Sequence, residues 1–143
     1  MNNEAKVLVV DDDEVVLPIY RGLFTAACFT TRYAGSAAEA LQAMAQQAFD
    51  VVLIDCLVPG MDGLALLRAI RELDADAEIL VITRASTVEQ AKAAMRLGAS
   101  DYMSKSVAPE EVVKAAASAA IRKKWALHRV PVLDPAQPSL KEK

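Results

Sequence analysis

Short runs of aliphatic residues, each followed by a polar residue, recur along this chain and constrain its fold more than any other feature. Residues 7–10, 51–54 and 79–82 are uninterrupted aliphatic stretches of strand length, which is typical of strands buried on both faces of a sheet. Weaker strand patterns lie at residues 30–34 and 101–103. Helical patterns separate them, and this alternation predicts an α/β fold: a doubly wound, five-stranded parallel sheet flanked by five helices.

The first helical segment follows a cluster of acids. Val15, Ile19 and Leu23 recur every fourth residue and are predicted to face the core. Pro18 lies inside this pattern, so we expect an early bend or a late helix start. Asp13 lies just before this pattern, and its carboxylate is expected only to interact favourably with the positive end of the helix dipole.

Local signals also bound the later helices. Capping boxes at residues 36–39 and 86–89 predict the starts of the second and fourth helices. Gly98 predicts the end of the fourth. The last helix is expected to begin at Pro109, and its basic residues 122–124 are expected near its end, where they suit the helix dipole.

Composition limits the class of protein. The 143 residues suffice for one domain with a sizeable core, which we assign to residues 1–127; the proline-interrupted residues 128–143 are predicted to be a disordered tail or linker. The net charge of −3 gives no nucleic-acid footprint. No stretch is long enough to span a membrane. Because Cys28 and Cys56 lack metal or redox spacing, a cytoplasmic location is expected.

Polar side chains follow four of the predicted strands. Asp11 and Asp12 follow the first and Asp55 follows the third. Thr83 ends the fourth, and Lys105 comes after the fifth. In open parallel sheets the site lies beyond the carboxyl ends of the strands, so these five side chains are expected to meet at one mouth.

Three carboxylates in one pocket repel one another, and a hard divalent cation relieves that repulsion. Mg2+ takes oxygen ligands and commonly combines one or two carboxylates with phosphate oxygens. Lys105 and Thr83 are suited to hold the remaining phosphoryl oxygens. Asp55 is the predicted nucleophile, because a carboxylate can form an aspartyl-phosphate. The residues therefore predict Mg2+-dependent phosphoryl chemistry.

These residues resemble the receiver domain of two-component response regulators. The resemblance covers roughly residues 5–125 and rests on a set of matched positions: residues 9–12, Asp55, Pro59, residues 61–63, Thr83 and Lys105. It implies the flavodoxin-like receiver fold with strand order 2-1-3-4-5. It also implies a signalling domain that assists only its own phosphorylation and dephosphorylation, and not a metabolic enzyme.

The resemblance implies a role for each site residue. Asp55 accepts a phosphoryl group from a partner histidine kinase or phosphotransfer protein. Asp12 and Asp55 ligate Mg2+ together with the backbone carbonyl of Leu57, while Asp11 acts mostly through water. Lys105 contacts the phosphoryl group.

The resemblance also implies a switch. Thr83 swings to hydrogen-bond the phosphoryl group, and Tyr102 turns inward to fill the vacated space. The result is a population shift in the face formed by the fourth helix, fifth strand and fifth helix. Homodimer formation through this face is left open. No membrane contact and no direct nucleic-acid binding by this chain is expected.

Three departures from the family pattern modify these expectations. Arg84 stands where a small residue is usual, and either narrows access to the site or points outward into solvent. Ser106 replaces a proline after Lys105, and predicts a trans peptide bond there. Leu57 and Ala85 are apolar where polar residues often admit the attacking water, which predicts a long-lived aspartyl-phosphate.

Two other functions remain open from the sequence. A pseudo-receiver would keep the fold as a constitutive protein-binding module without phosphorylation, which Arg84 and Ser106 make conceivable. A Mg2+-dependent phosphohydrolase with an aspartyl nucleophile commonly carries a second acid two residues after the nucleophile, where this chain has Leu57. Turnover of a phosphomonoester favours the hydrolase, and stoichiometric labelling favours the switch.

Overall fold

Strands and helices alternate strictly along the part of the chain that the structure describes. The computed structural model describes residues 5–56, 60, 62–84 and 87–128, with side chains through residue 123. Of the predicted tail, residues 128–143, only the first residue is described. The elements are β1 (Lys6–Val10), α1 (Leu17–Ala26), β2 (Thr30–Ala34), α2 (Ala37–Gln46), β3 (Val51–Asp55), α3 (Gly63–Leu73), β4 (Glu78–Thr83), α4 (Val88–Arg96), β5 (Asp101–Ser104) and α5 (Pro109–His128).

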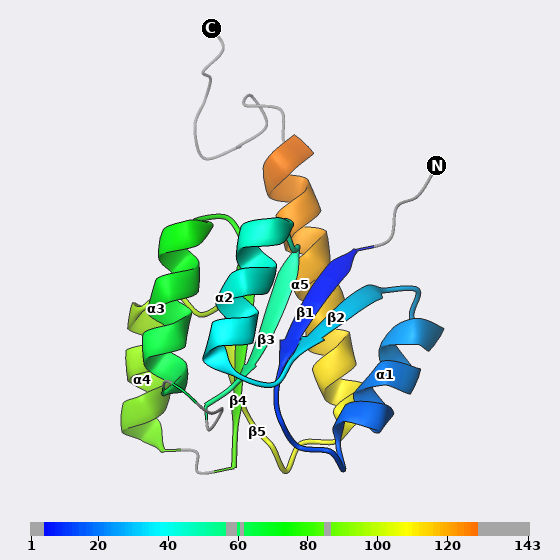
Figure 1. Ribbon diagram of the computed structural model, residues 1–143, viewed down its shortest axis with the longest axis horizontal. Helices are drawn as coiled ribbons and strands as arrows, with labels where there is room; N and C mark the ends of the chain where they lie inside the picture. The colour runs from blue at the N-terminus through cyan, green and yellow to red at the C-terminus, as the bar shows by residue number, and fades with distance from the viewer. Residues whose placement is uncertain (1–4, 57–59, 61, 85–86, 129–143) are drawn as a thin grey trace, which may run out of the picture.

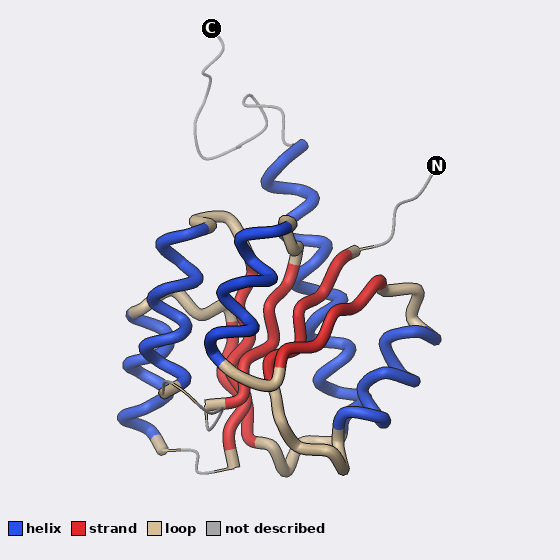
Figure 2. The backbone as a smooth tube through the Cα atoms, in the orientation of Figure 1, coloured by secondary structure: helices blue, strands red, loops and turns tan. Residues whose placement is uncertain are grey.

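The strands form one parallel sheet in the order β2-β1-β3-β4-β5, which confirms the predicted order. The register places Val10 of β1 beside Ile54 of β3, and Thr83 of β4 beside Ser104 of β5. The carboxyl ends of these four strands therefore share one edge. The loops that follow them meet at the lower end of the molecule in Figures 1 and 2.

Helices cover both faces of the sheet, with α2, α3 and α4 on one side and α1 and α5 on the other (Figure 1). β1 shows why the aliphatic runs are continuous. Leu8 and Val10 pack into the core on the first side, whereas Val7 and Val9 pack into the core on the second. Because both side-chain directions of the strand end in a core, no polar residue alternates with the apolar ones.

The inward face of α1 differs from the prediction. Val15 is 79% exposed and Ile19 is 46% exposed, whereas Tyr20 and Phe24 are buried. The predicted late start is confirmed, because the helix begins at Leu17 with a proline in its first turn. Val15 therefore lies outside the helix, and the aromatic pair, also four residues apart, takes the inward position.

The caps of α2 and α4 were predicted with different success. Ser36 caps α2 as expected: its hydroxyl accepts the Glu39 backbone N–H at 3.2 Å, and the Glu39 carboxylate accepts the N–H of the residue before the cap at 2.7 Å. α4 is capped one residue later than predicted, by Thr87, which accepts the Gln90 N–H at 3.1 Å. The predicted cap, Ser86, lies outside the described residues.

α5 begins at Pro109, as predicted, but continues past the basic residues that were expected near its end. Arg122 pairs instead with Glu78 of β4, with 3.1 Å between Nη2 and Oε1. Lys123 is buried, and its Nζ donates to the Phe49 carbonyl oxygen at 3.4 Å. These two cations bind α5 to neighbouring segments, contacts that the helix-dipole pattern alone does not predict.

Arg71, near the end of α3, connects two turns at the other edge of the sheet. Its Nη1 donates to the carbonyl oxygens of Ala75 at 2.9 Å and Ala77 at 2.6 Å, and its Nη2 donates to that of Gly98 at 2.6 Å. Gly98 has a φ of +102°, a left-handed conformation that terminates α4 as predicted. One guanidinium thus fastens the α3–β4 turn to the α4–β5 turn.

Gly63 lets the first turn of α3 pass directly against the end of β3. A Cβ added to Gly63 would lie 2.4 Å from Cα of Cys56, a backbone atom that cannot move alone. Gly22, exposed in α1, is a natural control, because a Cβ there has no neighbour within 4 Å.

We therefore expect Gly63→Ala to lower the free energy of unfolding by about 1–3 kcal/mol through overpacking. Gly22→Ala is expected to raise it by about 0.5–1 kcal/mol, because alanine is the better helix residue. Urea unfolding followed by circular dichroism measures both variants. A neutral or stabilising Gly63→Ala would contradict the close approach.

Candidate functional site

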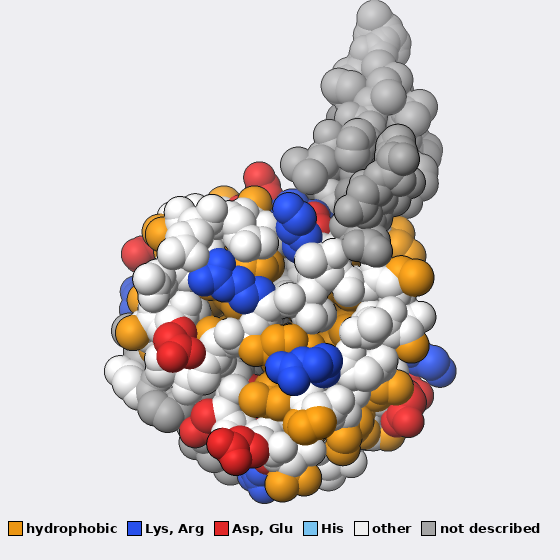
Figure 3. Space-filling view, turned by 45° about the vertical axis from the view of Figure 1, so that its right-hand side comes forward, with side chains coloured by type: hydrophobic (Ala, Val, Ile, Leu, Met, Phe, Trp, Pro, Cys, Tyr) orange, Lys and Arg blue, Asp and Glu red, His pale blue; other side chains and the backbone are white. Residues whose placement is uncertain are grey.

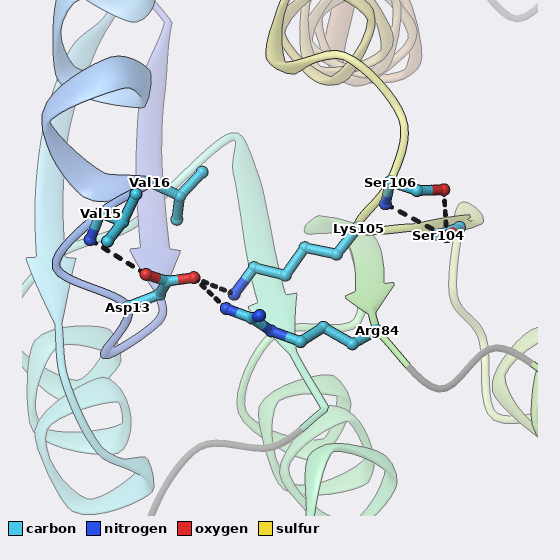
Figure 4. A pocket seen from close by; sticks show the side chains of 7 residues that line it. All are labelled: Asp13, Val15, Val16, Arg84, Ser104, Lys105 and Ser106. Carbon is cyan, nitrogen blue, oxygen red and sulfur yellow. Dashed lines mark hydrogen bonds and ion pairs between the residues drawn. The ribbon is translucent and has the colours of Figure 1, made fainter.

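The residues that follow four strands converge at one edge of the sheet. Lys105, after β5, extends across this edge toward the loop that follows β1 (Figure 4). Its Nζ lies 2.9 Å from Oδ2 of Asp55, 3.0 Å from Oδ2 of Asp11 and 3.3 Å from Oδ2 of Asp13. The Lys105 side chain is only 6% exposed, so one buried ammonium forms ion pairs with three carboxylates.

The pKa values in this cluster reflect a balance between burial and charge pairing. Burial alone would lower the pKa of Lys105, but hydrogen bonds to Asp55 and Asp11 outweigh it and raise that pKa above its ordinary value. Burial raises the pKa of Asp11, and the hydrogen bonds from the Asp13 backbone N–H and from Lys105 offset this only in part. Lys105 is therefore a full cation at neutral pH.

The carboxylates of Asp11, Asp12 and Asp55 lie close together, as predicted. One carboxylate oxygen from each lies within 4.8 Å of the others. Asp11 and Asp55 are buried and Asp12 is exposed, so solvent reaches the group from one side. An all-oxygen donor set with an open side fits Mg2+, which keeps several water ligands. The Leu57 carbonyl, predicted as a further ligand, lies outside the described residues.

Asp13 belongs to this site, although the sequence analysis assigned it only to the start of a helix. α1 begins four residues later, at Leu17. Asp13 accepts the Val15 backbone N–H at 2.9 Å, and this hydrogen bond, the largest cause, together with Lys105 holds the pKa of Asp13 below its ordinary value. Its other oxygen faces Lys105 and Arg84. The only sequence signal was the third consecutive acid, which by itself does not indicate a site.

Arg84 follows β4 directly and reaches across the same edge. Its guanidinium pairs with Asp13, while 62% of its side chain remains exposed. Figure 4 shows Arg84 and Lys105 approaching Asp13 from the same side. The three border a cavity of about 490 Å3 that Val16 and Ser106 also line. The side chain thus reaches solvent, one of its two predicted outcomes, and also lines this cavity.

Thr83 and Cys56 are neighbours beside Asp55. Thr83 is 1% exposed and Cys56 is 8% exposed. Burial, with smaller contributions from the charges of Asp55 and Asp62, raises the pKa of the Cys56 thiol to about 11, against a hydrogen bond with Thr83 that lowers it. Cys56 therefore behaves as a small buried apolar residue and not as a reactive thiol.

Tyr102 lies in β5, before Lys105, and Ser106 lies in the loop that follows Lys105. The half-buried Tyr102 donates its hydroxyl proton to Oε1 of Gln90, in α4, at 3.1 Å. This hydrogen bond joins β5 to α4. No cis peptide occurs among the described residues, so the Lys105–Ser106 bond is trans, as predicted. Ala85, the second position expected to slow hydrolysis, lies outside the described residues.

Comparison with known proteins connects this geometry to a family. Residues 7–117 match the profile of the response regulator receiver domain. Response regulator MprA from Mycobacterium ulcerans is 34% identical over 108 residues, covering 76% of this chain and 47% of MprA. Transcriptional regulatory protein ZraR from Escherichia coli is 37% identical over 99 residues, covering 69% of this chain and 22% of ZraR. The chain therefore matches less than half the length of each relative.

Solved structures share the fold. A receiver domain protein, described as CheY-like, from Methanospirillum hungatei superposes with a TM-score of 0.82 at 22% identity, covering 87% of this chain and 99% of that one. A response regulator receiver domain protein from Clostridium thermocellum superposes with a TM-score of 0.78 at 28% identity, covering 85% of this chain and 98% of that one.

Within the described residues, none of the helices has the length and hydropathy needed to cross a bilayer.

The two thiols are expected to differ sharply in reactivity. Cys28 is exposed, whereas Cys56 is buried and its pKa is raised to about 11. Because the thiolate is the reactive species, iodoacetamide at pH 8 should modify one thiol per native chain, and a second only after unfolding. Intact mass with peptide mapping measures this, and Cys28→Ser provides the control. Rapid modification of native Cys56 would contradict the described packing.

Proposed function

Because this chain belongs to the response regulator receiver domain family, we propose that Asp55 accepts a phosphoryl group and that the chain acts as a conformational switch in a two-component phosphorelay. The observation that carries the proposal is the Lys105 ammonium, 2.9 Å from Oδ2 of Asp55 and inside a cluster of acids. Response regulators are phosphorylated by histidine kinases. The proposed donor is accordingly a phosphohistidine on a partner kinase or phosphotransfer protein.

The proposed transfer makes one bond and breaks another. An oxygen of Asp55 attacks phosphorus while the phosphorus–nitrogen bond of the donor breaks, and the electron pair of that bond stays on the imidazole nitrogen. The product is an aspartyl-phosphate with more negative charge than the carboxylate it replaces. Lys105 is positioned to pair with that charge, because its Nζ already lies beside the attacking group.

Asp11, Asp12 and Asp55 are the residues that would hold Mg2+. Their three carboxylates outnumber the single Lys105 ammonium among them, which favours a divalent cation. When bound, Mg2+ supplies neutralising charge to the phosphoryl oxygens. By analogy with the family, Asp12 and Asp55 would hold it directly with the Leu57 carbonyl, and Asp11 would hold it mainly through water.

The proposed switch connects Thr83 to Tyr102. Thr83 lies at the end of β4, next to Asp55, and Tyr102 connects β5 to α4 through its hydrogen bond with Gln90. Movement of Thr83 toward a phosphoryl group would make space for the Tyr102 ring and release this hydrogen bond, shifting an existing equilibrium between two states. Val88 and Met95, 65% and 49% exposed on α4, offer apolar contacts that a partner or a second copy would use.

The proposal extends to partners and location. A cytoplasmic chain of this kind would contact a kinase or phosphotransfer protein at the edge that carries Asp55. Neither a membrane nor direct nucleic-acid contact is needed for that role. The functions of the full-length relatives, including the transcriptional regulation that the name of ZraR states, would require segments beyond the matched receiver region.

Two rival functions are less well supported. In a pseudo-receiver the site would have lost its chemistry, yet here the trans Lys105–Ser106 bond still delivers the ammonium to Asp55. In a phosphohydrolase a second acid would be expected at position 57, where the sequence has leucine. Both observations favour the phosphoacceptor.

Labelling with acetyl phosphate tests the proposal directly. In the presence of Mg2+ the wild-type chain should gain one phosphoryl group, because Asp55 is the nucleophile, and Asp55→Asn should gain none. EDTA should suppress the gain. Intact mass spectrometry measures it, and Asp76→Asn, on an exposed aspartate at the opposite edge, is the matched control.

The same experiment separates the rivals. If the wild-type chain gains no phosphoryl group, the pseudo-receiver is the supported function. Continuous turnover of a phosphomonoester such as p-nitrophenyl phosphate, rather than one phosphoryl group per chain, would establish the hydrolase.

Mg2+ is expected to stabilise the folded chain, because it binds the native acid cluster and not the unfolded chain. At a concentration of about 100 times Kd the stabilisation is about 2.7 kcal/mol. Asp12→Asn should abolish the Mg2+-dependent rise in Tm without disturbing packing, since Asp12 is exposed. Asp76→Asn should retain the rise. Thermal unfolding with and without Mg2+ measures this, and an unchanged response in Asp12→Asn would remove that residue from the ligand set.

A further inference from the structure

Arg84 is a second cation at the edge of the sheet that carries Asp55. It leaves the end of β4, and its guanidinium meets the same Oδ2 atom of Asp13 that lies 3.3 Å from the Lys105 Nζ. Lys105 in turn lies 2.9 Å from Asp55. A continuous chain of charge contacts therefore runs from Arg84 through Asp13 and Lys105 to Asp55. Arg84 and Lys105 are the two cations that line the cavity of about 490 Å3 in the described part of the chain.

We propose that Arg84 is a second phosphoryl-binding cation, held by Asp13 until a phosphoryl group reaches the site and then transferred to its oxygens. This inference rests on the proposed function of Asp55. It assigns to Arg84 a part in recognising the phosphoryl group, either on the donor within the cavity or on Asp55 after transfer.

The pairing with Asp13 is weak enough to be exchanged. The Arg84 side chain is 62% exposed, and an ion pair in contact with water contributes little to stability. A phosphoryl group carries more charge than one carboxylate, and its oxygens match the planar, two-pronged geometry of a guanidinium. Exchange of Asp13 for a phosphoryl group is therefore favourable for Arg84.

Asp13 keeps other partners when Arg84 leaves it. Its Oδ1 accepts the Val15 backbone N–H at 2.9 Å, and its Oδ2 still faces Lys105. Losing Arg84 therefore does not leave a carboxylate without compensation, and the loop before α1 keeps its hydrogen bond. Asp13 acts as a competing partner that holds the guanidinium while no phosphoryl group is present.

A shielding role for Arg84 is the competing explanation, and it predicts the opposite sign. If Arg84 only obstructed the mouth, removing it would speed phosphorylation and strengthen the binding of phosphoryl analogues. If Arg84 binds phosphoryl oxygens, removing it weakens both. The exposed ion pair is too weak to hold a closed cover against a tightly bound anion, which favours the binding role.

The test uses the whole chain with Mg2+ and two probes: beryllium fluoride, titrated by calorimetry as a stable phosphoryl analogue, and acetyl phosphate, followed by intact mass. Arg84→Ala should weaken beryllium fluoride binding by about tenfold or more, the effect of losing a hydrogen bond to a charged group. It should also slow labelling. Arg84→Lys, which keeps the charge without the planar fork, should fall between.

Arg122→Ala is the matched control. Arg122 also pairs with one carboxylate, Glu78, but at the opposite edge of the sheet, so the same change in net charge should leave both readouts at the wild-type level. Asp13→Asn should tighten beryllium fluoride binding by freeing Arg84. When Asp13→Asn is combined with Arg84→Ala, the gain in beryllium fluoride affinity should be smaller than in the wild-type background. A smaller gain would show that the two residues are coupled.

The outcomes separate the two proposals. If wild-type chain binds beryllium fluoride and is labelled, but Arg84→Ala does both equally well or better, the role of Arg84 is overturned and the function of Asp55 stands. If wild-type chain does neither, the proposed function fails and this inference fails with it. Circular dichroism of each variant confirms that the fold is intact.

Discussion

Three negatively charged side chains surround the buried ammonium of Lys105. The site depends on this compensation of negative charge by one positive charge. Two of the carboxylates near Lys105, those of Asp11 and Asp55, are buried, where an isolated charge is costly. The sheet register brings them together, because β1 and β3 are adjacent and end at the same edge. Lys105 arrives from β5, the outermost strand on that side, so its long side chain must extend inward across β4. Removing the ammonium would take away the positive charge that lies within 3.0 Å of both buried carboxylates.

The sequence predicted the sheet well because its three central strands, β1, β3 and β4, are buried on both sides. A run such as residues 79–82 has no polar alternation to confuse with a surface strand, and each run ends where the structure ends it, to within a residue or two. Helix orientation was harder to predict. Of the predicted stripe, Leu23 packs against the core, but Val15 lies before the helix, which starts at Leu17, and Ile19 is 46% exposed. Which of two adjacent hydroxyls caps α4 likewise depends on backbone geometry that the capping-box pattern does not specify.

The site was predictable to the extent that strand ends determine it. Asp11 and Lys105 each follow a strand and Asp55 ends one, so topology alone brings them together. Asp13 was missed because its role depends on Arg84, which lies 71 positions away in the sequence. No local pattern indicates such a pair. The contact between Lys123 and Phe49 was not predictable for the same reason, because it exists only after α5 has packed on the sheet.

The link that Arg71 forms between the α3–β4 turn and the α4–β5 turn has a mechanical consequence for α4. It binds the Gly98 carbonyl, immediately beyond the end of that helix, and Ala94, the one residue of α4 that is fully enclosed, lies close to the same end. Val88, at the other end, is largely in solvent. The C-terminal end of α4 is therefore anchored to the fold, whereas its first turn is linked to β5 by the hydrogen bond between Gln90 and Tyr102. A displacement of α4 about its anchored end would be largest at that first turn.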